Sequence, residues 1–262
     1  MKHIKIVDTI ATFGNAEKYI SYEAKFEQFM NREFGLTRIK ELDPLAIVKK
    51  YNLKGIVFGN YVSQEERYFF LFKIEKQLSL LASLKGSNNL GKGILIIAFG
   101  SQGMAKANAH YNPSKQLINL NRGRKSRYTD ILKGESSFIH EYGHFIDFTT
   151  GTNDKTVNVH FPSKLALEPS GNKKSVYIAK TLQPIIKDIE YMNGIKHSHY
   201  LSLNIEIFAR LFEAAITHHA YNSNHRLRNY LDRSYTEEHY YPEMKIIQHN
   251  LDKRCIQILK NF

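Results

Sequence analysis

Two histidines and a glutamate near the middle of the chain have the spacing of a metal site with a general base. They are His140, Glu141 and His144, within the segment Phe138–Asp147. On a helix, residues four apart lie on the same face, so both imidazoles can reach one ion. Glu141 lies beside the first histidine, where a carboxylate can reach a metal-bound water. The pattern predicts one Zn²⁺ per chain with Glu141 as the catalytic base. The alternative is two histidines on a half-buried helix beside an ordinary surface glutamate.

A catalytic zinc takes three protein ligands and leaves a fourth position open. The best source of the third ligand is the apolar segment 204–213, in which Glu206, Arg210 and Glu213 recur at helical spacing and share one face. Burying that stripe without charged partners would be costly, so we expect it to meet the ion and its histidines. Glu206 is the predicted ligand, ahead of Glu213, and Arg210 and Glu213 are then supporting residues. The alternative is a Glu–Arg pair on a solvated face.

Other polar residues have roles that spacing alone leaves open. Asp147 follows His144 by three residues, and it could accept the N–H of a ligand histidine, help to orient the helix, or be an ordinary helix-end aspartate. A donor should also stabilise the oxyanion of the transition state. Candidates for this donor are His110, Tyr111, Arg210, Tyr240 and Tyr241.

Hydrophobic periodicity and turn residues predict an α+β fold that combines a small mixed or antiparallel sheet, the HExxH helix and a second helix that carries a ligand. Residues 1–45 read as a mainly helical segment packed on a domain formed by residues 46–262. A helix should follow the capping box at Ser63 and run to about Lys85. Later elements are predicted as strands over 93–100, 109–111 and 116–120, a long polar loop over 150–174, and helices over 175–193 (kinked or restarted at Pro184), 203–220 (capped by Ser202) and 242–261. The strand over 116–120 is expected to bind an extended peptide by strand addition.

The formal charge of the chain is strongly positive, because 37 Lys and Arg exceed 25 Asp and Glu by 12. This balance favours association with DNA, RNA or another polyanion, although a generic basic surface is an equal alternative. The densest basic cluster is Arg122–Arg127. The single cysteine, Cys255, excludes an intramolecular disulfide and has the spacing of a packing residue. The longest apolar run, Ile94–Phe99, is too short to span a bilayer, so no membrane insertion is expected.

Five segments together resemble one family. The similarity lies in Gly59–Arg67 (G-N-Y-V-S-Q-E-E-R), Leu95–Gly103 (L-I-I-A-F-G-S-Q-G), Ala109–Pro113 with Ile118–Leu120 (A-H-Y-N-P, I-N-L), His140–Asp147 (H-E-Y-G-H-F-I-D) and Glu206–Glu213 (E-I-F-A-R-L-F-E). They are similar, in order, to segments of the first of the large polyvalent protein-associated domains. The resemblance covers about residues 45–262. Tyr61 and Tyr142 stand where that family often has tryptophan, which this chain lacks.

The resemblance implies a zincin-like, specifically gluzincin-like, metallopeptidase domain encoded by a bacteriophage or other mobile element. A protein or peptide of the host or phage would be its substrate. The N-terminus lacks the apolar core of a signal peptide, so we expect a cytoplasmic protein of the bacterial host, although carriage in a phage particle would leave no such signal. Two alternatives to an active peptidase remain. One is a nucleic-acid-binding module with a structural metal, and the other is a virion or injected protein that kept the scaffold without activity.

Overall fold

The computed structural model describes most of the chain beyond residue 41. The described residues are 42–59, 62, 64–100, 109–121, 137–188, 192, 199–200, 202–228, 231 and 249–262. Residues 1–41 of the predicted N-terminal helical segment, the basic cluster Arg122–Arg127 and the candidates Tyr240 and Tyr241 all lie outside them. The capping residue Ser63 and residues 242–248 of the last predicted helix also lie outside them.

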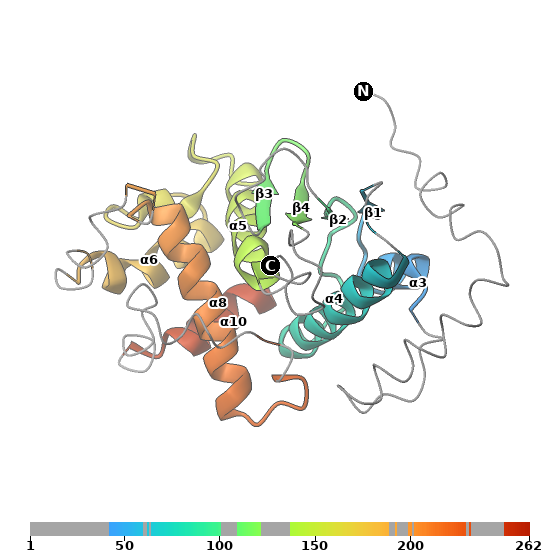
Figure 1. Ribbon diagram of the computed structural model, residues 1–262. Coiled ribbons are helices and arrows are strands. Elements are labelled where there is room, and N and C mark those ends of the chain that lie inside the picture. The colour runs from blue at the N-terminus through green and yellow to red at the C-terminus, as the bar shows by residue number, and fades with distance from the viewer. Residues whose placement is uncertain are drawn as a thin grey trace, which may run out of the picture.

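Four short strands form one mixed sheet. They are β1 (Gly55–Phe58), β2 (Ile96–Phe99), β3 (Ala109–Asn112) and β4 (Leu117–Leu120), in the spatial order β1-β2-β4-β3. The pairs β1–β2 and β2–β4 are parallel, and β3–β4 is an antiparallel hairpin (Figure 1). β2 begins three residues later than predicted, because the amides of Ile94 and Leu95 bond to the carbonyl of Gly91 in a turn.

Two helices gather at the β1–β2 end of the sheet. The short α3 (Pro44–Lys50) starts where the Asp43 carboxylate accepts a hydrogen bond from the Leu45 amide at 2.9 Å. The longer α4 (Gln64–Lys85) packs on β2 through Phe70, whose ring lies 4.7 Å from that of Phe99. It ends at Gly86, which has a positive φ of 75° and ends the helix as predicted.

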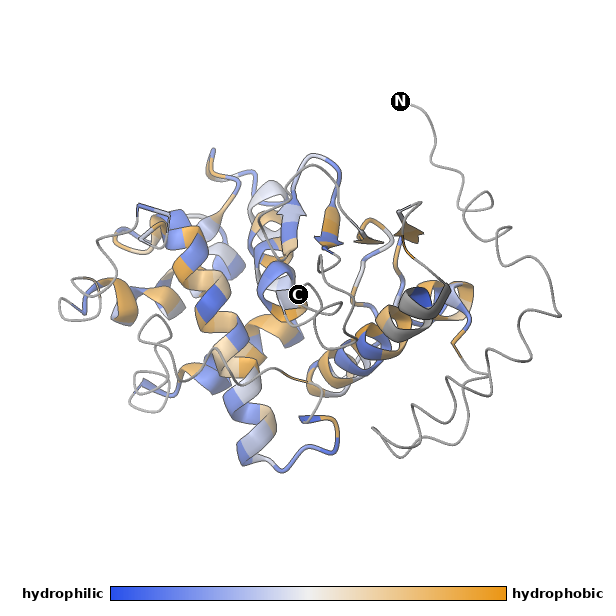
Figure 2. Ribbon diagram, viewed as in Figure 1, coloured by the Kyte–Doolittle hydropathy of each residue, from blue (hydrophilic) through white to orange (hydrophobic). Residues whose placement is uncertain are grey.

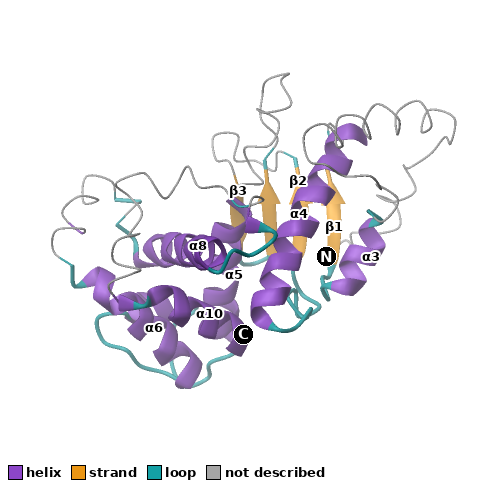
Figure 3. Ribbon diagram, turned by 90° about the horizontal axis from the view of Figure 1, so that it is seen from below, coloured by secondary structure: helices purple, strands orange, loops and turns teal. Residues whose placement is uncertain are grey.

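The remaining helices gather at the β3 end, as Figure 3 shows. They are α5 (Phe138–Thr152), α6 (Lys173–Ile186), α8 (Asn204–Asn222) and α10 (Leu251–Asn261), together with the short 3₁₀ helix η2 (Pro162–Leu165). α5 lies beside β3 and β4, and α8 packs along α5. The predicted loop over 150–174 is present, although α5 extends to Thr152 and η2 interrupts it. The α+β architecture with a small mixed sheet is therefore confirmed.

Two details of the predicted helices were wrong. Ser202 does not cap α8, because its hydroxyl donates to the carbonyl of His199, and the helix instead begins after Leu203 without a side-chain cap. Pro184 does not restart a helix. It lies in the last turn of α6, which ends at Ile186. The carbonyl of Lys180, which has no helical donor because of this proline, instead accepts a hydrogen bond from the Arg254 side chain of α10 at 3.3 Å.

A single hydrophobic cluster links the sheet and all of these helices, from Ile47 in α3 to Phe262 after α10. Figure 2 shows the orange apolar faces of α5 and α8 interrupted by blue residues. On α8 the polar residues Glu206, Arg210 and Glu213 are nevertheless buried. No helix in the described part of the chain combines the length and apolar character that a membrane crossing requires.

Candidate metal centre

The helix α5 presents His140 and His144 one turn apart, as their spacing predicted. Their rings lie edge to face with centroids 4.9 Å apart. The rest of the helix is anchored by apolar and aromatic side chains, and Tyr142 is fully buried with its hydroxyl donating to the carbonyl of Leu90 at 2.9 Å. This packing fixes the rotation of α5, so the two imidazoles are held on the side that faces α8.

A glycine in the motif lets the two helices come close. A Cβ on Gly143 would lie 3.3 Å from the Cα of Ala209 and 3.4 Å from the Cβ of Phe212, both on α8. Any larger residue would therefore push α8 away. Because Glu206 lies three residues before Ala209 on α8, this close approach brings its carboxylate to the two histidines.

The three predicted ligands converge on one point. The Nε2 atoms of His140 and His144 each lie 3.4 Å from a carboxylate oxygen of Glu206. One ligand atom from each of the three residues falls within 4.8 Å of the others, and theirs is the one such group that the described residues contain. Ligands bound tetrahedrally to zinc at about 2.0–2.1 Å are about 3.4 Å apart. The two separations of 3.4 Å are therefore compatible with ligands that share one ion.

The charges buried around this point also fit a divalent cation. Glu141, Glu206 and Glu213 are each at most 6% exposed, and Arg210 is 3% exposed. Three carboxylates and one guanidinium leave 3 − 1 = 2 negative charges among these groups. Isolated buried charge is very costly, so the site requires compensating positive charge. One Zn²⁺, or protons on the histidines, would supply it.

The pKa values of His140 and Glu206 show how the carboxylates act on this site without an ion. Burial alone would lower the pKa of His140, but contacts with Glu206 and Glu213 and the charge of Glu141 outweigh it and raise that pKa to about 10. Burial would raise the pKa of Glu206, but His140 and His144 hold it well below its usual range. The carboxylates therefore stabilise positive charge at this position.

Glu213 occupies the other side of His140. Its carboxylate lies 3.6 Å from Nδ1 of His140, while Nε2 of the same ring faces Glu206. A carboxylate on the outer nitrogen of a ligand histidine fixes the orientation of the ring and makes it a stronger ligand. The geometry therefore gives Glu206 the ligand position and Glu213 the supporting one. Arg210 lies buried between them on α8.

Glu141 is buried beside the histidines, 6% exposed. Burial, with a smaller contribution from Glu206, raises its pKa, while the charges of His140 and His144 act in the opposite direction. His110, on β3, also lies close enough to act on this carboxyl group. The Nδ1 atom of His110 is buried and has no hydrogen-bond partner among the described residues. Of the predicted donor candidates, His110 is thus placed towards Glu141.

Tyr200 is a site residue that the sequence did not reveal. Its hydroxyl reaches the carboxylate of Glu206, and the charges of Glu141 and Arg210 act on it. Burial of the hydroxyl and the two carboxylates raise the pKa of Tyr200, although 59% of the residue is exposed. Its carbonyl accepts the amide of Leu203 just before α8, which ties the tyrosine to the helix that carries the ligand. A hydroxyl from a largely exposed residue therefore lies beside the centre.

Of the roles predicted for Asp147, the structure supports orientation of the helix, because the residue is buried within α5 and its described hydrogen bonds go to Ser163. Its carboxylate accepts hydrogen bonds from the backbone amide of Ser163, at 3.1 Å, and from the Ser163 hydroxyl. Burial raises its pKa to about 6 despite these bonds. Asp147 therefore attaches the loop at η2 to the helix that carries the histidines. Tyr111 is likewise occupied, since its hydroxyl donates to Gln116 at 2.8 Å.

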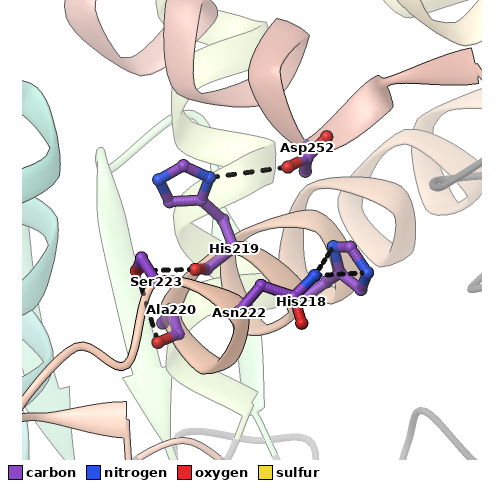
Figure 4. A network of polar contacts seen from close by, with 6 residues as sticks. All are labelled: His218, His219, Ala220, Asn222, Ser223 and Asp252. Carbon is purple, nitrogen blue, oxygen red and sulfur yellow. Dashed lines mark hydrogen bonds and ion pairs between the residues drawn. The ribbon is translucent and has the colours of Figure 1, made fainter.

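The histidines at the far end of α8 belong to a different network. Figure 4 shows His219 facing Asp252 of α10 at 3.5 Å and His218 beside Asn222. Neither belongs to the group of possible metal ligands that the described residues contain.

A nearby serine–histidine pair does not form a nucleophile either. Nδ1 of His225 accepts the amide of Leu227, so its Nε2 carries the proton and donates to Ser83 at 2.8 Å. A histidine in this tautomer cannot take the proton of the serine hydroxyl.

Comparison of the chain with protein-family models, with curated proteins and with solved structures found no match. The family resemblance drawn from the five sequence segments stays a prediction.

Proposed function

We propose that this protein is a zinc-dependent peptidase. The observation that supports it best is the convergence of His140, His144 and Glu206 within 4.8 Å, next to the buried carboxyl of Glu141. A structural zinc site needs no general base and fills its fourth position with protein. A donor set of two histidines and one glutamate, with a carboxyl beside it, is the composition of a hydrolytic site.

Zn²⁺ at this site would lower the pKa of a bound water to about 7 and polarise a carbonyl oxygen. Glu141 would accept the proton of the attacking water and pass it to the leaving amine. Its burial favours this exchange, because it raises the pKa of the carboxyl towards that of the water. Glu213 would orient His140 throughout.

Two groups are available to stabilise the developing oxyanion. Tyr200 brings a hydroxyl to Glu206 from the exposed side, and His110 has a buried nitrogen without a partner among the described residues. A donor placed where negative charge develops contributes far more in a site shielded from water than it would in solution. We assign this role first to Tyr200, because its hydroxyl already contacts the ligand-bearing region.

The sheet offers a place for an extended peptide, although not where the sequence suggested. β4 lies between β2 and β3, so both of its edges are already paired and the predicted strand addition at residues 116–120 is wrong. β3 is the edge strand next to α5, and among the described residues nothing pairs with its outer side. It carries His110 and lies against α5. We propose that substrate adds to β3, where its backbone would pass the metal centre.

The test is metal content followed by cleavage. Purified protein should hold about one zinc per chain by plasma mass spectrometry, and His144→Ala should lose it. Glu141→Gln should keep zinc and lose cleavage of an unbiased peptide library. Wild-type protein without zinc, even after zinc is supplied, would refute the metal site. A fully active Glu141→Gln variant would refute the mechanism.

A second candidate function is association with a polyanion. Besides the net charge of +12, the described residues gather Lys85, Lys92 and Lys174 closely enough that burial and the other two lysines lower the pKa of Lys92 to about 8. An anion near them would relieve this repulsion. If this function holds, affinity for DNA or RNA should fall steeply with added salt. An absence of binding at low salt would exclude it.

A further inference from the structure

We propose that the peptidase prefers substrates with a large apolar side chain beside the scissile bond, which packs on an aromatic patch formed by Tyr111, Phe148, His160 and Phe161. This inference rests on the proposed function. The patch joins the three elements that would border a bound peptide. Tyr111 is on the edge strand β3, Phe148 is on α5, and the other two precede η2.

Phe148 is the centre of the patch. Its ring lies 5.2 Å from that of Phe161, 5.8 Å from His160 and 6.1 Å from Tyr111, measured between centroids. None of the four residues is fully buried. Aromatic rings that remain partly open can gain further contact area when another apolar group covers them. A cluster whose only task was to hold the loop on α5 would not need this open face.

The patch lies at the right distance from the metal centre. Phe148 follows His144 by four residues, so it lies one helical turn further along the same side of α5, a rise of about 6 Å. An extended peptide advances about 3.3 Å per residue. The side chain that meets Phe148 thus belongs to a residue one or two positions from the bond at the metal. Because Tyr111 is part of β3, a peptide paired with that strand would pass the patch.

The loop that carries Phe161 is held firmly in place. Ser163 is tied to the buried carboxylate of Asp147 on α5. Asp154 accepts hydrogen bonds from the amides of Thr156 and Asn172, at 2.9 and 2.7 Å, which closes the base of the loop. The patch is therefore a rigid surface. Such a surface can discriminate between substrate side chains because it does not rearrange to accommodate those that fit poorly.

The positive charge of Lys164, at the edge of the aromatic patch, also restricts which substrate side chains can bind there. The Nζ atom of Lys164 lies 5.7 Å from the centroid of the Phe161 ring. A basic substrate residue would be repelled by this ammonium group, whereas phenylalanine, leucine or methionine would not. We therefore expect a preference for apolar over basic residues at the position concerned.

The experiment compares peptide-library cleavage by wild type, Phe148→Ala and Phe161→Ala, with Leu167→Ala as the matched control. Leu167 is in the same loop and 61% exposed, but it has no ring in the patch. Wild type should favour a large apolar residue at one position beside the cut, and both patch variants should lose about tenfold or more of that preference. Zinc content and melting temperature are measured in parallel to detect a purely structural effect.

The outcomes separate the two proposals. Cleavage by wild type without apolar preference, or a preference that both patch variants keep, would overturn the subsite and leave the peptidase standing. If zinc-loaded wild type cleaves nothing, the proposed peptidase activity is refuted. Binding of the same library to the Glu141→Gln protein then tests whether the patch binds apolar side chains. Enrichment of apolar peptides that Phe161→Ala abolishes supports a peptide-binding patch, and equal binding of all peptides overturns it.

Discussion

Replacing Glu213 with glutamine tests whether the second carboxylate of α8 supports the metal or binds it. The substitution keeps size and packing but removes the charge that faces Nδ1 of His140 at 3.6 Å. Glu206, by contrast, is 3.4 Å from the Nε2 atoms of both histidines. The structure therefore predicts unequal losses of zinc affinity for Glu213→Gln and Glu206→Gln.

The expected magnitude follows from the role of each carboxylate. Loss of an outer carboxylate on a ligand histidine typically costs 10- to 100-fold in metal affinity. At about 1.4 kcal/mol per tenfold, Glu213→Gln should cost about 1.4–2.8 kcal/mol of zinc binding. Glu206→Gln removes a ligand and should cost clearly more, because two histidines alone leave the ion half coordinated and the buried charge altered.

The assay is competition for zinc with a chromophoric chelator at fixed pH and salt, since protons and ions both compete with the metal. Glu168→Gln is the matched control, because it makes the same charge change at an exposed position in the loop. It should bind zinc like wild type. If Glu213→Gln loses more affinity than Glu206→Gln, the two roles are reversed. If both bind like wild type, the stripe on α8 is an ordinary Glu–Arg pair and not part of a metal site.

Three further predictions follow from the same geometry. Gly143→Ala places a Cβ 3.3 Å from Ala209, so it should cost about 1–3 kcal/mol in urea unfolding and weaken zinc binding; unchanged values would refute the close helix contact. In metal-free protein, His140 has a raised pKa of about 10, so its stabilising contribution should be complete below its unfolded pKa near 6.5 and lost as pH rises towards 10. Urea unfolding should show this decline in wild type and not in His140→Gln, and a decline of equal size in both would contradict it. Tyr200→Phe should keep zinc but reduce kcat about 100-fold, and a variant with unchanged kcat would exclude the hydroxyl from the oxyanion role.

The predictions that succeeded depended on local periodicity. The four-residue spacing of His140 and His144 fixes a shared helix face wherever the helix packs, and the same reasoning placed Glu206, Arg210 and Glu213 on one side of α8. The contact between α5 and α8 was inferred only from the energetic cost of burying charge, since a buried charged stripe requires a partner. Gly143 was available as a signal for close helix packing, but its meaning depends on Ala209, which is distant in sequence.

The features that were missed depend on contacts between distant segments. Ser163 is 16 residues from Asp147, and no sequence pattern in either segment predicts their hydrogen bonds. Tyr200 stands alone before α8 and belongs to no motif. The error at residues 116–120 has a similar origin, because alternation identifies a strand but does not say whether it lies at the edge or inside the sheet.

The buried polar stripe also explains why a metal and the fold would depend on each other. Without an ion, the groups among the described residues that can compensate Glu206 and Glu213 are Arg210 and a protonated His140, and the raised pKa of His140 reflects this demand. A protonated imidazole cannot bind zinc, so the ion must displace a proton that the carboxylates hold. Zinc binding near neutral pH should therefore release protons into the buffer, and calorimetry in buffers of different ionisation enthalpy would detect them. Binding without proton release would mean that the carboxylates do not act on His140 and that the charge balance inferred for this site is wrong.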